Sequence, residues 1–345
     1  MEYGHGGDIY TYRDMLDFSV NVNPLGPSRK VIEAAKKGVE RAAQYPDSRC
    51  RELRAALSEK KGIPGECFIF GNGAADLFFS LVLAEKPKRA VIPVPAFSEY
   101  AHALRTVGCR IEEYVLRREE QFTLTEDFLE CLTPETDIVF LCSPSNPAGQ
   151  VIPRELLCRI ADRCEAARIR LVVDECFIDF LPEPSEFTME RMSDQYSCLF
   201  VVQAFTKIHA IPGLRLGYGI TSDLELLERI QQVRQPWSVS TPAQAAGLAA
   251  LQDSDRVQAA RELVCSERRR MEKELREAGV EVIPSKANFI LIYSQYDLFS
   301  LLKDRGILIR NCSNYSGLGK GWYRTAVRRK EENDRLLEAI RQVCG

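Results

Sequence analysis

The sequence lacks the features that mark nucleic-acid-binding and membrane proteins. Among 345 residues, 46 Lys and Arg stand against 49 Asp and Glu, so there is no basic excess to bind a phosphate backbone. No apolar run approaches the roughly 20 residues that a membrane helix needs, and the N-terminal segment MEYGHGGDIYTYR has no apolar core typical of a signal peptide. We therefore expect a cytoplasmic protein with neither nucleic-acid nor membrane partners.

Patterned cysteine is also lacking. The chain has 12 cysteines, but none forms a C-x-x-C pair, which argues against zinc knuckles and thioredoxin-type redox sites. Histidine is scarce, with three residues in the whole chain. We expect reduced thiols, several of them in the core, and no metal site.

The order of apolar segments predicts two structural units, as the length also suggests. Short apolar runs predict strands at 89–94, 109–116, 136–142, 169–175 and 198–205. Between them, segments 97–107, 153–167 and 223–234 have the apolar spacing of helices. Such alternation indicates an α/β fold with a mostly parallel central sheet covered by helices.

After about residue 235 the pattern changes to that of a smaller α+β unit. A long charged helix is expected at 254–278, short strands at 279–283, 287–292, 306–310 and 322–327, and a closing helix at 330–343. We predict an N-terminal arm over residues 1–30, a large domain over 31–235 and a small C-terminal domain over 236–345. The arm is rich in Gly and Pro, so we expect it to pack against the small domain and the functional site.

Five motifs of the large domain lie at strand ends or strand-to-helix turns. They are GNGAAD (71–76), PAFSEY (95–100), SNPAG (145–149), DECF (174–177) and TKIHAIPGLRLG (206–217). Each motif alone has an ordinary explanation as a turn, a helix cap or a surface charge. Because open α/β sheets bind ligands at the carboxyl ends of their strands, the ordered set predicts a site.

Together the motifs supply the groups that pyridoxal phosphate needs. A helix N-terminus with small residues lets backbone N–H groups approach a phosphate. An aromatic ring can stack on the pyridine, a carboxylate can keep its nitrogen protonated, and a lysine can bind it covalently. Arg215 and the hydroxyl of Thr206 would add charge-assisted bonds to the phosphate.

In this order and over essentially the whole chain, the motifs resemble the fold-type I pyridoxal-phosphate enzymes. The most similar branch holds the histidinol-phosphate aminotransferases and the threonine-phosphate decarboxylases. The resemblance implies that Lys207 binds the cofactor covalently and that Asp174 holds the pyridinium nitrogen. It also assigns further cofactor contacts to Asn146 on O3′, Phe97 on the ring, and the amides of Ala74 and Ala75 with Thr206 and Arg215 on the phosphate. Tyr45, in QYPD (44–47), would reach the phosphate from the partner subunit of a homodimer.

The two ends of the chain resemble the decarboxylases in particular. GHGGD (4–8), DFSVNVNPLG (17–26), ILIRNCSNYSGL (307–318) and WYRTAVR (322–328) carry this resemblance. It implies that His5 and Asn23 line the substrate site, and that Arg310 and Arg324 bind the phosphate and carboxylate of a substrate. Two anionic groups need more than one bidentate cation, and the planar fork of arginine suits both.

The implied reaction is decarboxylation of threonine O-3-phosphate to (R)-1-amino-2-propanol O-2-phosphate for cobalamin side-chain synthesis. The analogue serine O-phosphate, which would give ethanolamine phosphate, differs by one methyl group, and the sequence leaves that choice open. Phe177 stands where many relatives place a Tyr that bonds O3′, which would leave Asn146 as the main donor there. The first alternative is an aminotransferase of the histidinol-phosphate type acting on a phosphorylated amino substrate. The second alternative is a non-catalytic pyridoxal-phosphate regulator, which would need DNA-reading helices, and the sequence shows no basic helix-turn-helix ahead of the arm.

Overall fold

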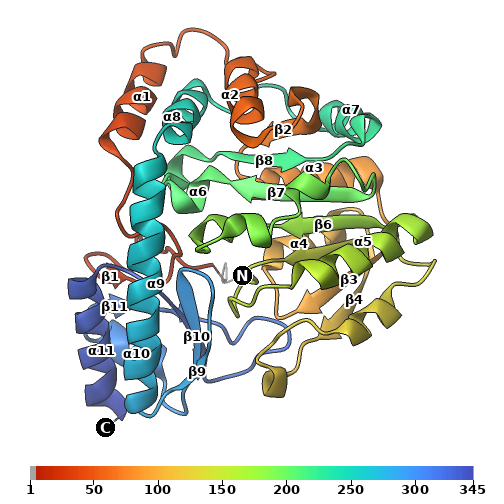
Figure 1. The fold of residues 1–345 in the computed structure, drawn as a ribbon. Helices are drawn as coiled ribbons and strands as arrows, with labels where there is room; N and C mark the ends of the chain where they lie inside the picture. Colours follow the sequence, from red (N-terminus) through yellow and green to blue (C-terminus); the bar gives the residue numbers. More distant parts are fainter. Residues whose placement is uncertain (1–4, 345) are drawn as a thin grey trace.

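A seven-stranded sheet forms the centre of the larger part of the molecule in this computed structural model, which describes residues 5–344 (Figure 1). Its strands are β2 (Phe68–Gly71), β3 (Arg89–Val94), β4 (Arg110–Val115), β5 (Ile138–Cys142), β6 (Arg170–Asp174), β7 (Leu199–Ala204) and β8 (Gly217–Ile220). Their order is β2-β8-β7-β6-β5-β3-β4, and β8 is the one strand of this sheet that runs opposite to the other six. The predicted mostly parallel sheet is confirmed.

Helices cover both faces of this sheet, which explains why its inner strands are apolar throughout. Val139 and Leu141 of β5 join the core on one face. Ile138 and Phe140 alternate with them and join the core on the other face. The first core includes residues of α2 (Arg51–Lys61), α5 (Arg154–Ala167) and α8 (Thr241–Leu251); the second includes residues of α3 (Ala74–Glu85), α4 (Ser98–Thr106) and α7 (Leu224–Val233).

The smaller part is built on a separate antiparallel sheet of order β12-β13-β10-β9. Its strands are β9 (Glu281–Ile283), β10 (Phe289–Tyr293), β12 (Arg310–Asn311) and β13 (Trp322–Ala326). Helices α9 (Ser254–Glu277), α10 (Leu298–Lys303) and α11 (Lys330–Cys344) pack on it. Figure 1 shows α9 running along one side of the molecule from α8 to this sheet.

The N-terminal arm joins the two parts. Its strand β1 (Leu16–Asp17) pairs in parallel with β11 (Ile307–Leu308) of the small part. Residues 1–4 of the predicted arm lie outside the described residues. The boundary placed after residue 235 stays a prediction; α8, which lies beyond it, packs against α1 (Arg29–Val39) and α2 of the large part.

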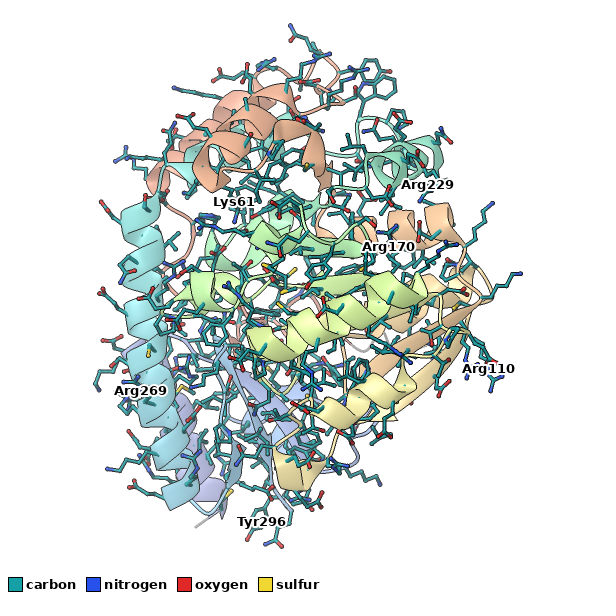
Figure 2. The ribbon with its side chains drawn as sticks, turned by 45° about the vertical axis from the view of Figure 1, so that its right-hand side comes forward. Lys61, Arg110, Arg170, Arg229, Arg269 and Tyr296 are labelled. Carbon is teal, nitrogen blue, oxygen red and sulfur yellow. The ribbon has the colours of Figure 1, made fainter. Side chains whose placement is uncertain are left out.

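Side chains fill the space between the layers, whereas long charged ones such as Arg110 and Arg269 extend into solvent (Figure 2). Among residues 5–344, no helix is both long and apolar enough to cross a bilayer. Over the same residues, no group of three or more His, Cys, Asp or Glu side chains is arranged to hold a metal ion.

Strands β2 and β8 have no counterpart in the sequence prediction. Both are four residues long, and β8 alternates glycine with larger residues, a composition with low strand propensity. The glycine has a packing reason: a Cβ at Gly219 would lie 2.5 Å from the ring of Phe200. Tertiary packing thus selects a residue that local propensity disfavours.

Candidate active site

Lys207 lies in the short helix α6 (Phe205–Ile208), which follows β7 directly. The pKa of its amine is lowered from 10.5 to about 8, mainly by burial; Arg324 and Arg215 also lower it, while Cys176 and Asp174 act in the opposite direction. A lowered pKa increases the neutral fraction, which is the form of a lysine that attacks a carbonyl carbon. The electrostatics of this position therefore suit a nucleophilic lysine.

Asp174 ends β6 and is 4% exposed. The Tyr100 hydroxyl donates to its Oδ2 (2.5 Å), and the Cys176 backbone N–H donates to its Oδ1 (2.9 Å). Burial raises the pKa of this carboxyl, and these hydrogen bonds together with Lys207 lower it. Tyr100 was not predicted as a site residue, although it follows Phe97 by three residues in the same motif. The two bonds fix the carboxyl group in one orientation.

The N-terminus of α3 and the Arg215 side chain meet at a site kept open by glycine. A Cβ at Gly73, the residue before Ala74, would lie 2.3 Å from Arg215 Nη2. A Cβ at Gly217 would lie 2.7 Å from the backbone nitrogen of Ala74. Backbone N–H groups of Ala74 and Ala75 at a helix start, beside a guanidinium, form a site for an anion such as a phosphate.

Arg215 completes this site as a cation with neutral partners. Its Nη1 donates to the Pro212 carbonyl (3.2 Å) and its Nη2 to the Asn72 carbonyl (3.5 Å). Thr206, which precedes Lys207, is buried in α6. A lysine of lowered pKa, a buried carboxyl and an open anion site fit pyridoxal phosphate, whose aldehyde, pyridine nitrogen and phosphate need these three groups.

Arg324 of β13 is a buried cation, 6% exposed. Its Nη1 donates to Asn146 Oδ1 (2.5 Å) and its Nη2 to the Ser19 carbonyl (2.9 Å). Asn21, with its amide oxygen turned to Arg324, accepts from Nε (3.1 Å) and Nη1 (3.2 Å). Among the described residues, these hydrogen-bond partners are all neutral. A buried cation without a counter-charge is costly, so this position is suited to an anionic ligand.

Arg310 of β12 is the cross-strand partner of Arg324. Opposed residues of an antiparallel pair project to the same face, where like charges destabilise a sheet. Arg310 donates to Asn314 Oδ1 (2.9 Å) and lines a cavity of about 390 Å³ with His5 and Ser19. Two arginines side by side are consistent with a ligand that carries two anionic groups.

His5 of the arm reaches the large part of the molecule. Its Nε2 lies 3.0 Å from Glu99 Oε1, and its ring centroid lies 6.0 Å from that of Phe97. Glu99 also pairs with His102 through its other oxygen (3.1 Å). Glu99 was not predicted; its place between Phe97 and Tyr100 in PAFSEY is the signal that was available.

Asn23 ties the arm to the lysine segment. Its backbone N–H donates to the Lys207 carbonyl (2.9 Å), and its Nδ2 donates to the Ile208 carbonyl (2.7 Å). Its Oδ1 accepts from the Leu25 N–H (2.9 Å). These bonds hold α6 in place, and the predicted contact of Asn23 with a substrate stays a prediction.

Tyr45 lies away from these residues, in the loop between α1 and α2 at the top of Figure 1. Its side chain is 79% exposed and stacks on Trp237, with ring centroids 4.5 Å apart. Contact between Tyr45 and the phosphate site of a partner subunit would require a second copy of the chain. Its predicted role across a dimer interface stays a prediction.

Comparison with known proteins places the chain among pyridoxal-phosphate enzymes. It is 38% identical to the threonine-phosphate decarboxylase of Salmonella typhimurium, over 98% of this chain and 96% of that protein. It is 32% identical to the histidinol-phosphate aminotransferase of Methanococcoides burtonii, over 95% and 90% of the two chains. The solved structure of the histidinol-phosphate aminotransferase from Clostridium acetobutylicum superposes with a TM-score of 0.89 at 28% identity, covering 95% of this chain and 99% of that one.

The model of the family described as aminotransferase class I and II matches residues 13–340. This range includes β1 of the arm, the whole seven-stranded sheet and the sheet that carries Arg310 and Arg324. With that match, the chain belongs to the aminotransferase class I and II family, whose members use pyridoxal phosphate.

Proposed function

We propose that this protein is a pyridoxal-phosphate-dependent carboxy-lyase that decarboxylates threonine O-3-phosphate or serine O-phosphate. The observation that carries the proposal is the cross-strand pair of Arg310 and Arg324 beside the arm. A substrate with a phosphate and a carboxylate carries two negative charges, which match the two guanidinium groups that lie opposite each other on β12 and β13. The 38% identity to a protein named threonine-phosphate decarboxylase supports the same substrate class.

The arginines would select which bond at Cα breaks. When bound, pyridoxal phosphate accepts the electron pair left when a bond at Cα breaks, provided that the bond stands perpendicular to the ring. Arg324, held by Asn146 and Ser19, would fix the substrate carboxylate, and Arg310 with His5 would fix the phosphate. Two fixed ends define the rotation about Cα and direct the carboxylate to leave as carbon dioxide.

Lys207 would then supply the proton that replaces the carboxylate. With a pKa of about 8, its amine exchanges protons readily near neutral pH. Protonation of Cα by Lys207 Nζ yields an amino-alcohol phosphate. Asp174 would keep the pyridine nitrogen protonated throughout, as its fixed orientation allows.

An aminotransferase of the histidinol-phosphate type is the second candidate. It is supported by the 32% identity to the Methanococcoides burtonii enzyme and by the TM-score of 0.89 with the Clostridium acetobutylicum enzyme. It would use the same Lys207, but to remove the Cα proton, so that the amino group passes to a keto acid such as 2-oxoglutarate and the substrate leaves as an oxo product. The two candidates differ in products, so an assay separates them.

A homodimer is the further part of this proposal. Tyr45 and Trp237 form a stacked aromatic pair whose members are 79% and 46% exposed, which is unusual for rings of this size. A second copy of the chain would cover this pair and place Tyr45 at the partner's phosphate site. Loss of activity at the dilution where the dimer dissociates would support this arrangement.

The assay uses the protein loaded with pyridoxal phosphate and three substrates. Threonine phosphate and serine phosphate are supplied alone, histidinol phosphate is supplied with 2-oxoglutarate, and carbon dioxide and glutamate are followed separately. We expect carbon dioxide from one of the first two. Glutamate without carbon dioxide would overturn the decarboxylase proposal in favour of the aminotransferase.

Lys207→Ala is the control for that assay. It should lower turnover by roughly 10²- to 10⁴-fold or more, since both covalent binding and proton transfer are lost. Borohydride, which fixes the cofactor to the lysine that holds it, should label the parent and not the variant. A variant that is still labelled at the site would show that another lysine binds the cofactor.

A further inference from the structure

Two phenylalanines lie between the two cations of the site. Lys207 Nζ lies 5.6 Å from the ring centroid of Phe177, and the Arg324 guanidinium lies 5.3 Å from that of Phe289. The two rings pack edge to face, with centroids 5.0 Å apart and planes at 77°. Lysine, ring, ring and arginine thus form one continuous series of contacts.

The series crosses from the large part of the molecule to the small part. Phe177 follows the end of β6, three residues after Asp174, and Phe289 opens β10. Both rings are almost fully buried, in a cluster that also contains Phe180 and Ile208. The contact between the rings therefore lies between the lysine of one part and the arginine of the other.

Aromatic faces suit this position better than any charged group. A ring face attracts a cation through its quadrupole and neither takes nor gives a proton. A carboxylate in the place of Phe177 would pair with Lys207 and hold its amine protonated. The ring instead holds the amine while leaving it free to react.

We propose that Phe177 is a positioning residue that holds Lys207 against its ring and, through Phe289, fixes the lysine relative to Arg324. The part of this proposal that concerns Lys207 needs only the cofactor. The part that concerns Arg324 rests on the proposed function, because it assumes that Arg324 binds the substrate carboxylate.

Four charged or titratable side chains affect the pKa of Lys207. They are Cys176, Arg324, Arg215 and Asp174. Replacing Phe177 with another apolar residue leaves these four side chains in place. Burial has the largest effect on this pKa and lowers it, so any loss of burial in the variant would raise the midpoint, and a fall in the midpoint reports the lost attraction of the ring for the protonated amine.

The test measures how fast pyridoxal phosphate combines with the apo-protein as a function of pH. This rate depends on the neutral amine, so it should rise with a midpoint near the lysine pKa of about 8. In Phe177→Leu the protonated amine loses its aromatic partner, and we expect the midpoint to fall by roughly 0.5 to 1 pH unit. Phe177→Met, which conserves volume better, carries the same test if the leucine variant does not fold.

Phe289→Leu is the matched control. It removes the second ring, which faces Arg324, so the midpoint should stay at its parent value while KM for the phosphorylated amino acid rises about three- to tenfold. An unchanged midpoint in a folded Phe177 variant, or an equal shift in Phe289→Leu, would overturn the proposal. The cofactor measurement uses no substrate, so a shift there stands even if the decarboxylase assay fails.

Discussion

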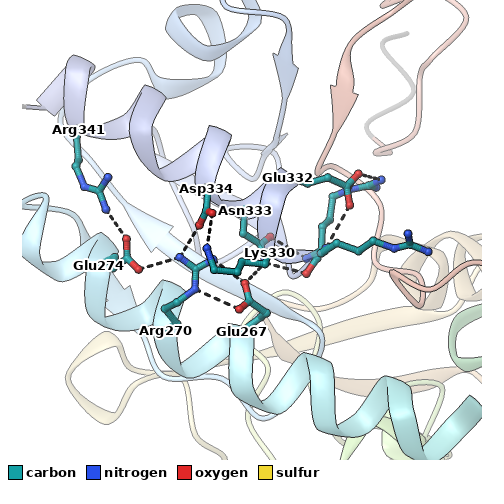
Figure 3. A network of polar contacts seen from close by, with 10 residues as sticks. Glu267, Arg270, Glu274, Lys330, Glu332, Asn333, Asp334 and Arg341 are labelled. Atoms are coloured by element: carbon teal, nitrogen blue, oxygen red, sulfur yellow. Dashed lines mark hydrogen bonds and ion pairs between the residues drawn. The ribbon is translucent and has the colours of Figure 1, made fainter.

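Two buried or half-buried arginines of the small part have opposite surroundings. Arg324 is held by the side-chain amides of Asn146 and Asn21 and by the Ser19 backbone carbonyl. Arg270 of α9 contacts three carboxylates, those of Glu267 (2.7 Å), Glu274 (2.9 Å) and Asp334 (2.7 Å), and Figure 3 shows it at the centre of a network between α9 and α11. Arg324 thus has only neutral hydrogen-bond partners among the described residues, whereas Arg270 is neutralised by carboxylates of the fold.

We interpret the difference as one between an arginine that stabilises the fold and an arginine that would bind the substrate. Glu274 and Asp334 extend the network to Arg341 and Lys330, so the charges on the two helices nearly cancel. Under the proposed function, by contrast, the cost of burying Arg324 is tolerated because the substrate carboxylate would neutralise it. Neutral hydrogen-bond partners around a buried arginine are therefore the structural mark of the site.

Replacement of Arg324 should produce the largest effect. We expect Arg324→Met to lower kcat/KM by about 10²- to 10³-fold, because charge-assisted bonds to the carboxylate are lost. The free energy of unfolding should stay equal or rise, since a buried cation without a counter-charge is replaced by a thioether. Steady-state kinetics and urea unfolding measure the two quantities. A loss of stability that accounts for the loss of activity would make Arg324 a structural residue.

The fold could be predicted from sequence where a single segment carries the signal. The β6 and β7 segments were found because each contains a short apolar run, at 171–173 and 199–202, that ends shortly before Asp174 or Lys207. Strands β2 and β8 were missed because their glycines are required by tertiary contacts, such as that of Gly219 with Phe200, and not by strand propensity. Local pattern identifies buried strands and fails where neighbours from other strands choose the residue.

The chemistry of the site was predictable in kind but not in its surroundings. Arg324 was singled out from its motif, yet its partners Asn146 and Ser19 lie 178 and 305 positions away in the chain. No spacing rule links Phe177 to Phe289, which meet only when the two parts pack together. Contacts over such separations arise only from the fold. A motif can therefore identify a site residue, but only the structure shows which residues it contacts.

Glu175 extends the comparison to a buried acid. It is almost fully buried and accepts hydrogen bonds from Gln203 Nε2 (2.9 Å), the Thr188 hydroxyl (2.6 Å) and the Met189 N–H (2.6 Å). Burial raises its pKa from 4.5 to about 7, against the lowering effect of these bonds. Like Arg324, it is a buried ionisable group whose direct hydrogen-bond partners are neutral.

The raised pKa of Glu175 should appear in the pH dependence of the free energy of unfolding. Between pH 4.5 and 7 the folded state keeps a proton on Glu175 that the unfolded state has lost. The contribution of Glu175 to the free energy of unfolding is therefore complete below pH 4.5 and is lost as the pH rises to about 7. We expect the parent to lose about 2–3 kcal/mol more than Glu175→Gln over this range. Urea unfolding of both proteins at pH 5 and pH 8 measures it. Identical pH dependence would mean that Glu175 is ionised in the fold at both values.

Replacement of Arg270 should have the smallest effect and the opposite character to that of Arg324. Its side chain is 26% exposed, so solvent screening limits the loss in Arg270→Met to about 1–2 kcal/mol of unfolding free energy, with kcat/KM unchanged. The matched control is Lys273→Met on the same helix, whose partner Glu277 lies 3.7 Å away with both side chains well exposed; it should cost less than about 0.5 kcal/mol. If Arg270→Met lowered kcat/KM as Arg324→Met does, neutralisation by carboxylates would not distinguish a structural arginine from a substrate-binding one, and the comparison would fail.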